Sequence, residues 1–151
     1  REEFDQKGVR FKFLGDLKDS KIPEENKNLM KETEEITKNN NTLNLVFAFN
    51  YGSQNEIHNA VLKLHNKNIN KNLELVDIES NLYNYFQYPE VPFPDALLRT
   101  AGEKRISNFL LYQLSYTELI FIDTLWPDVN EDILDDVLLE FNTRNRTYGQ
   151  N

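Results

Sequence analysis

The side chains best suited to chemistry lie in one ten-residue stretch of the sequence. It reads Arg99-Thr100-Ala101-Gly102-Glu103-Lys104-Arg105-Ile106-Ser107-Asn108 and places cations on both sides of a glycine. Arginine side chains bind phosphate oxygens through paired hydrogen bonds, and glycine allows a ligand to approach the backbone closely. A helix beginning at Ser107 would add its free amides and the positive end of its dipole. The stretch therefore predicts a phosphate site.

Each of these residues also has a purely structural interpretation. Arg99 and Arg105 can pair with nearby acids, and Ser107 can serve only as a helix N-cap. Glu118 begins an apolar run, where a carboxylate is either paired with a basic neighbour or held for a cation. The sequence alone leaves these alternatives open.

Other possible sites are less specific. His58 and His65 are seven residues apart, which favours surface positions, because two metal ligands on one helix face are three or four residues apart. The acids between Glu131 and Glu140 predict a solvated helix face. The GxSxG, Walker and GxGxxG motifs do not occur in the sequence.

Four short apolar runs predict the strands that position these residues. They are Val9–Leu14, Leu43–Phe49, Asp95–Leu98 and Leu119–Ile122. The second and fourth are almost continuously apolar, which is typical of parallel strands covered on both faces. Ligands bind at the carboxyl ends of such strands, and the third run leads directly into the arginine-rich stretch.

Helical patterns lie between the strands. One opens at Pro23, with Leu29, Thr33 and Ile36 on its less polar side. A capping box, Ser53 to Glu56, opens a second, whose buried face would hold Ile57, Ala60, Val61 and Leu64. A third, apolar nearly all round, begins at Ser107, and a fourth after Pro127 has an apolar face of Ile133, Leu134, Val137, Leu138 and Phe141. The alternation predicts an α/β fold, a parallel sheet flanked by helices.

Composition narrows the function classes. The 151 residues fit one domain, and 17 basic against 25 acidic residues, a net charge of -8, argue against non-specific nucleic-acid binding. The chain has no cysteine, which excludes disulfides and thiolate chemistry and fits a reducing compartment. No apolar run approaches the roughly 18–20 residues that span a bilayer.

The arginine-rich stretch and its surroundings resemble a known family. Asp95 to Leu114, Ser115-Tyr116-Thr117-Glu118-Leu119 and Asp123-Thr124-Leu125-Trp126-Pro127-Asp128 closely resemble the signature of cis-prenyltransferases, the undecaprenyl diphosphate synthase and dehydrodolichyl diphosphate synthase family. Gly8-Val9-Arg10 to Gly15-Asp16 and Leu43-Asn44 to Asn50-Tyr51-Gly52 are similar too, in the same order. The resemblance implies an α/β parallel-sheet fold and Mg²⁺-dependent condensation of isopentenyl diphosphate onto an allylic diphosphate such as farnesyl diphosphate, giving Z double bonds in a long-chain polyprenyl diphosphate.

The resemblance also implies roles for single residues. Arg99, Arg105 and Ser107 match residues that bind the diphosphate of isopentenyl diphosphate. Glu118 matches a catalytic carboxylate of the magnesium environment, and Glu103 matches a motif acid that supports the site. The implied protein is a cytoplasmic homodimer with peripheral membrane contact through its lipid product.

The sequence departs from the family pattern at three places. Position 104 is Lys, where many bacterial members have His, and Thr147 replaces the arginine of the terminal Arg-x-Gly element. The Asp-Gly-Asn-x-Arg-Trp loop, which supplies the metal-binding aspartate, does not occur, and the only tryptophan is Trp126. We therefore expect residues 1–151 to be a single domain, the C-terminal portion of a cis-prenyltransferase catalytic domain whose N-terminal part is missing, and to be inactive alone.

Two other functions remain as alternatives. The first is a non-catalytic subunit of a heteromeric cis-prenyltransferase. Such subunits generally lose the Arg-Thr-x-Gly-Glu motif, which Arg99 to Glu103 retains. The second is an unrelated α/β phosphate-binding module, which the ordered series of similar motifs disfavours.

Overall fold

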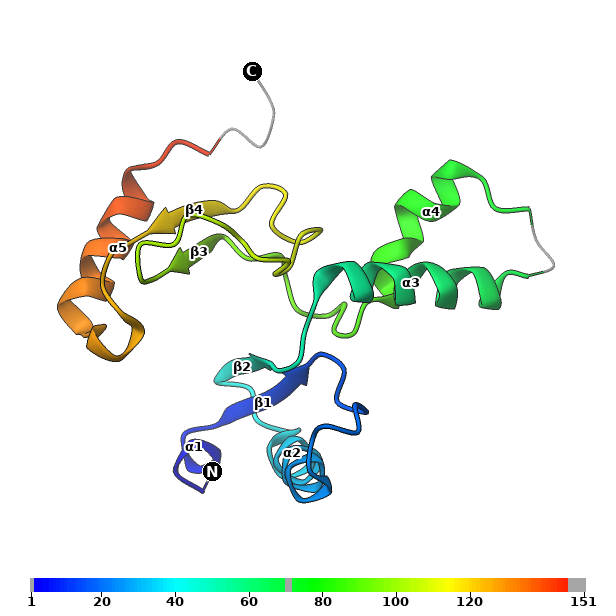
Figure 1. Cartoon of the computed structure of the whole chain (residues 1–151), viewed down its shortest axis with the longest axis horizontal. Helices are drawn as coiled ribbons and strands as arrows, with labels where there is room; N and C mark the ends of the chain where they lie inside the picture. Colours follow the sequence, from blue (N-terminus) through cyan, green and yellow to red (C-terminus); the bar gives the residue numbers. More distant parts are fainter. Residues whose placement is uncertain (1, 70–71, 147–151) are drawn as a thin grey trace. The chain divides into compact units, whose positions relative to one another are not determined.

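The computed structural model describes residues 2–69 and 72–146 (Figure 1). Residues 1–89 and 90–151 form two compact units, and each unit contains one pair of parallel strands. The architecture is α/β with parallel strands and flanking helices, as expected. The prediction that the chain is a single domain stays a prediction.

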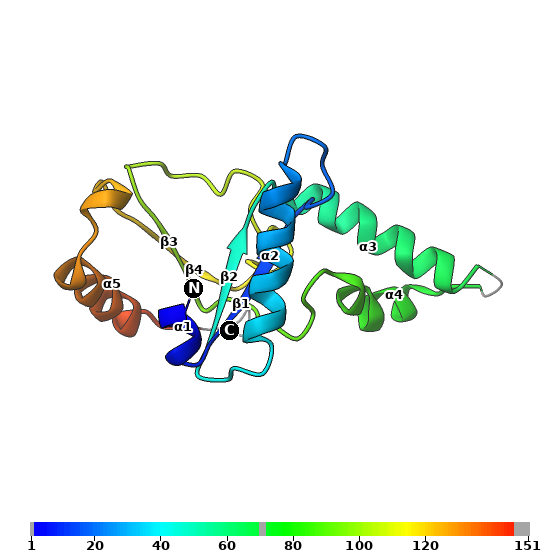
Figure 2. The same cartoon turned by 90° about the horizontal axis from the view of Figure 1, so that it is seen from below.

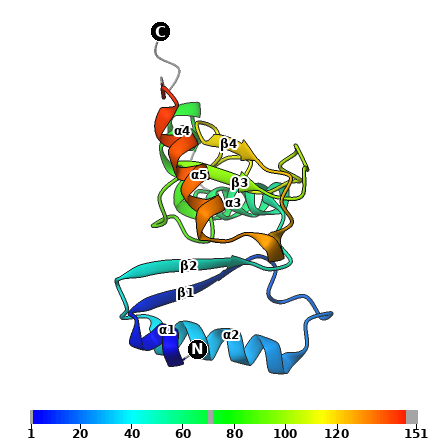
Figure 3. The same cartoon turned by 90° about the vertical axis from the view of Figure 1, so that its left-hand side faces the viewer.

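The first unit is built on a pair of parallel strands. Its elements are α1 (Glu2–Gln6), β1 (Val9–Leu14), α2 (Glu24–Thr37), β2 (Leu43–Ala48), α3 (Ser53–Lys67), α4 (Leu75–Asn81) and the 3₁₀ helix η1 (Leu82–Tyr85). Val9 lies opposite Leu43 and Leu14 opposite Ala48. Helix α2 packs against β1, as Figures 2 and 3 show, and Val9, Phe11 and Leu14 are buried.

The strands of this unit differ in their burial. The predicted bounds of β1 are confirmed. The prediction that the second apolar run would be covered on both faces is wrong for β2, in which Leu43 is 56% exposed and Phe47 46% exposed. Helix α2 covers β1 rather than β2, and this explains the difference.

The predicted stripe of α2 is confirmed at only one of its three positions. Thr33 is buried, together with Thr37, whereas Leu29 and Ile36 are exposed. The Thr37 hydroxyl accepts a hydrogen bond from the Phe11 amide (3.0 Å), so polar pairing with β1 decides which side of α2 faces inward.

Helix α3 differs from its prediction at its start and on its face. The predicted capping box would make Ser53 the N-cap. In the structure Gly52 is the N-cap and Ser53 is the first helical residue. Ala60 and Leu64 are buried as predicted, but Val61 is exposed.

The second unit contains β3 (Ala96–Arg99), β4 (Glu118–Phe121), the 3₁₀ helix η2 (Trp126–Asp128) and α5 (Glu131–Thr143). The strands are parallel, with Ala96 opposite Glu118 and Arg99 opposite Phe121. Ile120 is the most deeply buried side chain of β4. Asn130 caps α5, because its Oδ1 accepts a hydrogen bond from the Ile133 amide (3.0 Å).

Helix α5 covers β4 with only part of its predicted apolar face. Ile133, Val137 and Phe141 are half-buried, whereas Leu134 and Leu138 are exposed. Successive turns of a helix align residues four apart, so the two exposed leucines form their own stripe. No helix in residues 2–69 and 72–146 combines the length and the apolarity needed to cross a bilayer.

The helix predicted from Ser107 is wrong. Residues 107–116 form a series of turns between β3 and β4. Ser107, Asn108 and Leu110 have φ angles of 47°, 61° and 46°, which belong to the left-handed region and are incompatible with a right-handed helix. The apolar composition of this run does not indicate that three of its residues have positive φ angles.

Candidate functional site

The carboxyl ends of β3 and β4 are joined by backbone hydrogen bonds. The Ala101 amide donates to the Thr124 carbonyl (2.8 Å), and the Gly102 amide donates to the Ile122 carbonyl (2.9 Å). Ala101 and Gly102 both have positive φ angles, 65° and 68°, so the chain turns sharply directly after β3. This turn places Arg99 at the last position of β3.

Gly102 is the residue that this turn requires. A Cβ atom at position 102 would lie 3.1 Å from Oδ1 of Asp123, in addition to the strain of its positive φ. The Asp123 carboxylate thus lies directly behind the turn. Asp123 directly follows the predicted strand Leu119–Ile122, but no role could be predicted for it from the sequence.

The two arginines of the stretch have different surroundings. Within the part of the chain that the structure describes, Arg99 is half-buried and has no acidic partner. Arg105 forms an ion pair with Glu103, and its side chain is 64% exposed. The alternative that these arginines pair with nearby acids is therefore observed for Arg105 but, among the described residues, not for Arg99.

The predicted helix mouth at Ser107 is not formed. Ser107 is exposed and lies in a turn, so it is not a helix N-cap. The amides of Ala101 and Gly102 are already bonded to carbonyls that follow β4. These two amides are therefore not available to an anion, whereas the side chains of Arg99, Lys104, Arg105 and Ser107 could bind one.

Glu118 lies at the other end of the strand pair. It is the first residue of β4, opposite Ala96, whereas Arg99 is the last residue of β3. Three residues of parallel strand span about 10 Å. The structure thus brings Glu118 and the arginine loop to the same pair of strands but to opposite ends of it.

The Glu118 carboxylate is held by Arg144. Nη1 of Arg144 donates to Oε2 of Glu118 (2.9 Å) and to the Leu119 carbonyl (3.0 Å). Arg144 also pairs with Glu140 one turn earlier in α5. Hydrogen bonds to Glu140 and then to Glu118 raise the pKa of Arg144 above its ordinary value.

Glu118 offers a magnesium ion one carboxylate. No cluster of three or more His, Asp or Glu side chains suitable for a metal occurs in the described residues. Mg²⁺ usually binds one or two carboxylates and completes its coordination with phosphate oxygens and water. Glu118 fits such a partial ligand set, with Oε2 fixed by Arg144.

A second ion pair lies close to the first. Nη2 of Arg146 pairs with Oδ1 of Asp95 (2.7 Å), the residue directly before β3. The amide of Glu118 donates to the Asp95 carbonyl (3.0 Å), so both arginines after α5 bind the amino ends of the strands. Thr147 and the rest of the terminal element lie outside the described residues.

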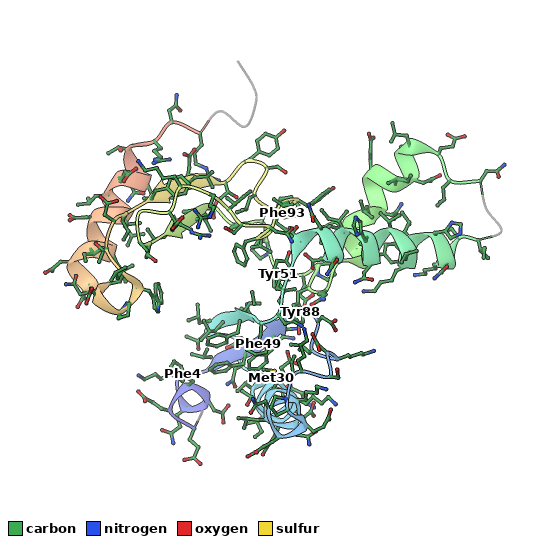
Figure 4. All side chains as sticks on the ribbon, viewed as in Figure 1. Phe4, Met30, Phe49, Tyr51, Tyr88 and Phe93 are labelled. Carbon is green, nitrogen blue, oxygen red and sulfur yellow. The ribbon has the colours of Figure 1, made fainter. Side chains whose placement is uncertain are left out.

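The first unit has a cleft of about 900 Å³ at the carboxyl ends of β1 and β2. Tyr51 and Tyr88, labelled in Figure 4, both line it. The buried Glu56 also lines the cleft and accepts hydrogen bonds from the Tyr51 hydroxyl (2.6 Å) and the backbone amide of Gln87 (3.2 Å). Sequence reasoning gave Glu56 only a capping role and missed Gln87, since no local pattern marks a side chain that pairs 72 residues away with Gly15.

Comparisons with known proteins connect both units to one family. The family model described as "Putative undecaprenyl diphosphate synthase" matches residues 1–149. The chloroplastic (2Z,6Z)-farnesyl diphosphate synthase of Solanum lycopersicum is 40% identical over 98% of this chain. The (2E,6E)-farnesyl-diphosphate-specific ditrans,polycis-undecaprenyl-diphosphate synthase of Micrococcus luteus is 37% identical over 97% of it.

Solved structures show the same fold. A probable undecaprenyl diphosphate synthase from Campylobacter jejuni matches 99% of the chain with a TM-score of 0.84 and 33% identity. The lavandulyl diphosphate synthase of Lavandula x intermedia, solved with dimethylallyl diphosphate, matches 94% with a TM-score of 0.86 and 32% identity. The chain spans about half the length of its curated relatives, 52% and 59% for the two proteins above, and 67% and 61% of the two solved chains.

Proposed function

Because the chain belongs to the undecaprenyl diphosphate synthase family of cis-prenyltransferases, we propose that it carries the isopentenyl diphosphate site of such an enzyme. The proposed reaction condenses isopentenyl diphosphate with an allylic diphosphate, such as farnesyl diphosphate. The allylic C–O bond breaks and diphosphate leaves. A carbon–carbon bond forms, a proton is lost, and the new double bond has the Z configuration. Repeated condensation gives a long-chain polyprenyl diphosphate.

The observation that carries this proposal is the loop that follows β3. Arg99 stands at the carboxyl end of a parallel strand without an acidic partner among the described residues, and the Gly102 turn follows it at once. A half-buried guanidinium without a counter-ion is poised for an anion, and its fork matches the geometry of a diphosphate better than a lysine would. Isopentenyl diphosphate supplies that anion in the proposed reaction.

The other residues of the loop have supporting roles in the proposal. Arg105 gives a second fork and exchanges its Glu103 partner for the ligand, while Glu103 keeps Arg105 near the loop until then. The Ser107 hydroxyl donates to a phosphate oxygen. Lys104 adds positive charge but cannot act as a proton shuttle near neutral pH, as a histidine could. Fixed donors of this kind position the substrate for attack.

Magnesium is the proposed cofactor, and Glu118 is the residue that would bind it in this chain. When bound, the ion stabilises negative charge that develops on a departing diphosphate. Arg144 holds the Glu118 carboxylate in place through Oε2. The remaining ligands would come from phosphate oxygens, water and residues beyond those described.

The remaining parts of the proposal concern the assembly and the location of the enzyme. We propose a cytoplasmic homodimer that contacts membranes only peripherally, through its lipid product. The alternative of a non-catalytic subunit is weaker, because Arg99, Gly102 and Glu103 remain in an ordered turn.

The test is a pair of substitutions, Arg99→Ala and Arg105→Ala, in a catalytically active form of the enzyme that contains this chain. Each substitution removes a charged hydrogen bond to phosphate. The cost is roughly 1.5–3 kcal/mol, or about ten- to a hundredfold in kcat/KM for isopentenyl diphosphate. The KM for the allylic substrate should change much less.

The matched control is Arg10→Ala, which removes a half-buried arginine from β1, outside the proposed site. It should leave the KM for isopentenyl diphosphate unchanged. Normal kinetics in both Arg99→Ala and Arg105→Ala would show that the loop does not bind this substrate.

A further inference from the structure

Two charges of opposite sign lie at the carboxyl ends of β3 and β4. Arg99 ends β3 and lies opposite Phe121, and Asp123 follows Phe121 by two residues. Two residues of strand and one spacing between strands correspond to about 8 Å between the Cα atoms of Arg99 and Asp123. Among residues 90–146 of the second unit, neither side chain has a partner of opposite charge, and the two do not pair with each other. Within this unit both charges therefore lack a counter-ion.

The backbone around Asp123 is bonded to the turn after β3. The Gly102 amide donates to the Ile122 carbonyl (2.9 Å), and the Ala101 amide donates to the Thr124 carbonyl (2.8 Å). One of these bonds thus lies on each side of Asp123. A Cβ atom at position 102 would lie 3.1 Å from Oδ1 of Asp123, so the missing side chain of Gly102 leaves room for the carboxylate. The Asp123 carboxylate is therefore held directly against the loop that follows β3.

A carboxylate in this place opposes the binding of a bare anion. The cations of the loop attract a diphosphate, whereas Asp123 repels it. A diphosphate that carries a divalent cation presents both signs of charge. Its oxygens suit the guanidinium of Arg99, and its cation suits a carboxylate. Since Mg²⁺ usually binds one or two carboxylates together with phosphate oxygens and water, a single carboxylate beside a phosphate site is a sufficient protein ligand.

We propose that Asp123 makes the loop after β3 selective for a diphosphate in complex with Mg²⁺ over the free diphosphate. This inference rests on the proposed function, in which Arg99 binds the diphosphate of isopentenyl diphosphate. That diphosphate stays in the product, so Asp123 selects the form of the substrate and takes no part in the bond that breaks. Glu118 does not share this place, because it begins β4 at the opposite end of the strands and already pairs with Arg144.

The test is a calorimetric titration of the 151-residue chain with inorganic pyrophosphate, once with excess Mg²⁺ and once with EDTA. Asp123→Asn keeps the size of the side chain and removes its charge. With EDTA this variant should bind pyrophosphate about two- to fivefold more tightly than wild type, because a repulsive charge is lost. With Mg²⁺ it should bind roughly tenfold more weakly, because the cation loses its carboxylate. Selectivity thus predicts a change of sign between the two conditions.

Two control variants separate this role from a general effect of charge. Asp135→Asn removes an exposed acid from α5, in the same unit, and should change both affinities by less than about a factor of two. Asp123→Glu restores a carboxylate and should recover part of the binding that depends on Mg²⁺.

A second measurement does not require the short chain to fold. In a catalytically active form of the enzyme that contains this chain, Asp123→Asn should raise the KM for isopentenyl diphosphate and the Mg²⁺ concentration that gives half of the maximal rate. It should change kcat little, because the reacting bonds lie elsewhere. Unchanged values of both quantities would contradict the selective role.

The remaining outcomes distinguish this inference from the proposed function. An Asp123→Asn effect of the same sign with Mg²⁺ and with EDTA, or no effect, would overturn the inference alone, provided that Arg99→Ala weakens binding in both conditions. A change of sign in Glu118→Gln but not in Asp123→Asn would also overturn it, because it would assign the cation to Glu118. Unchanged binding in Arg99→Ala, or no binding of pyrophosphate at all, would overturn the proposed function and this inference together.

Discussion

Arg144 contacts three acceptors at the point where α5 ends and β4 begins. Its guanidinium donates to Glu118, to the Leu119 carbonyl and to Glu140. A single side chain thus joins the helix to the strand and fixes the carboxylate that the resemblance assigns to magnesium. Arginine suits this role because its planar fork presents several donors in fixed directions.

Replacement of Arg144 should therefore loosen the second unit. We expect Arg144→Gln to lower the melting temperature of the chain. Arg144→Lys should lower it less, because a lysine can still pair with one carboxylate. The control is Arg105→Gln, which removes an exposed pair with Glu103 and should change the melting temperature little. Equal melting temperatures for wild type and Arg144→Gln would refute the joining role.

The destabilisation caused by Arg144→Gln should not depend on pH near neutrality. Hydrogen bonds to Glu140 and then to Glu118 raise the pKa of Arg144 above its ordinary value. Because the pKa of Arg144 is higher in the folded chain than in the unfolded chain, its ion pairs stabilise the fold fully below the unfolded-state pKa. This stabilisation is lost only as the pH rises through the folded-state pKa. The difference in melting temperature between Arg144→Gln and wild type should thus stay constant between about pH 6 and pH 9.

At the scale of elements, the turn after β3 determines where the arginines lie. Ala101 and Gly102 both have positive φ angles, yet only one of them is a glycine. Alanine in the left-handed region costs roughly 1–2 kcal/mol. The two neighbouring positions should therefore respond to substitution in opposite directions.

We predict that Gly102→Ala destabilises the chain by about 1–2 kcal/mol, because it adds this strain and a contact with Asp123. Ala101→Gly removes the same strain and adds some entropy to the unfolded chain, so it should be neutral or slightly stabilising. Urea unfolding of the two variants measures both effects. A stabilising Gly102→Ala would show that the turn has another conformation in solution.

The strands could be predicted from the sequence, but the turns after Ser107 and the short helices α1 and α4 could not. Alternating and continuous apolar runs located all four strands to within about one residue, as Val9–Leu14 shows. The run after Ser107 is equally apolar, but its backbone is set by three left-handed residues that composition does not mark. The exposure of β2 was also missed, because an apolar run indicates the environment that a strand suits, not the neighbours that the described chain provides.

The candidate site could be predicted in part. The spacing of arginines around Gly102 located the loop, and the structure adds that Arg99 has no acidic partner in the described residues while Arg105 has one. The contacts of Glu118 with Arg144 and of Gly15 with Gln87 could not be predicted, since they join residues 26 and 72 positions apart. Such pairings depend on the tertiary fold.

At the scale of the whole molecule, exposed apolar side chains indicate association. In the second unit Trp126 is 71% exposed, and Leu134 and Leu138 form an exposed stripe on α5, 43% and 57% exposed. Apolar patches of this kind usually mark interfaces. We expect the chain to associate with itself at micromolar concentrations, through a two-fold contact if the interface is isologous.

Sedimentation velocity measures this association directly. The variant Leu134→Glu/Leu138→Glu should shift the chain toward monomer, because each glutamate would have to be desolvated at the interface. The control Leu29→Glu/Ile36→Glu changes two exposed apolar residues of α2 in the first unit and should leave association unchanged. A well-folded wild-type monomer at these concentrations would count against the homodimer.

The central proposal is that this chain supplies the isopentenyl diphosphate site of a cis-prenyltransferase and needs further residues to complete the active site. The most direct measurement incubates labelled isopentenyl diphosphate, farnesyl diphosphate and Mg²⁺ with the purified 151-residue chain and, in parallel, with a version extended at its amino end. We predict elongated product with Z double bonds from the extended version and none from the short chain, because Glu118 alone provides too few ligands to stabilise the departing diphosphate. Elongated product from the short chain, or none from either protein, would contradict the claim.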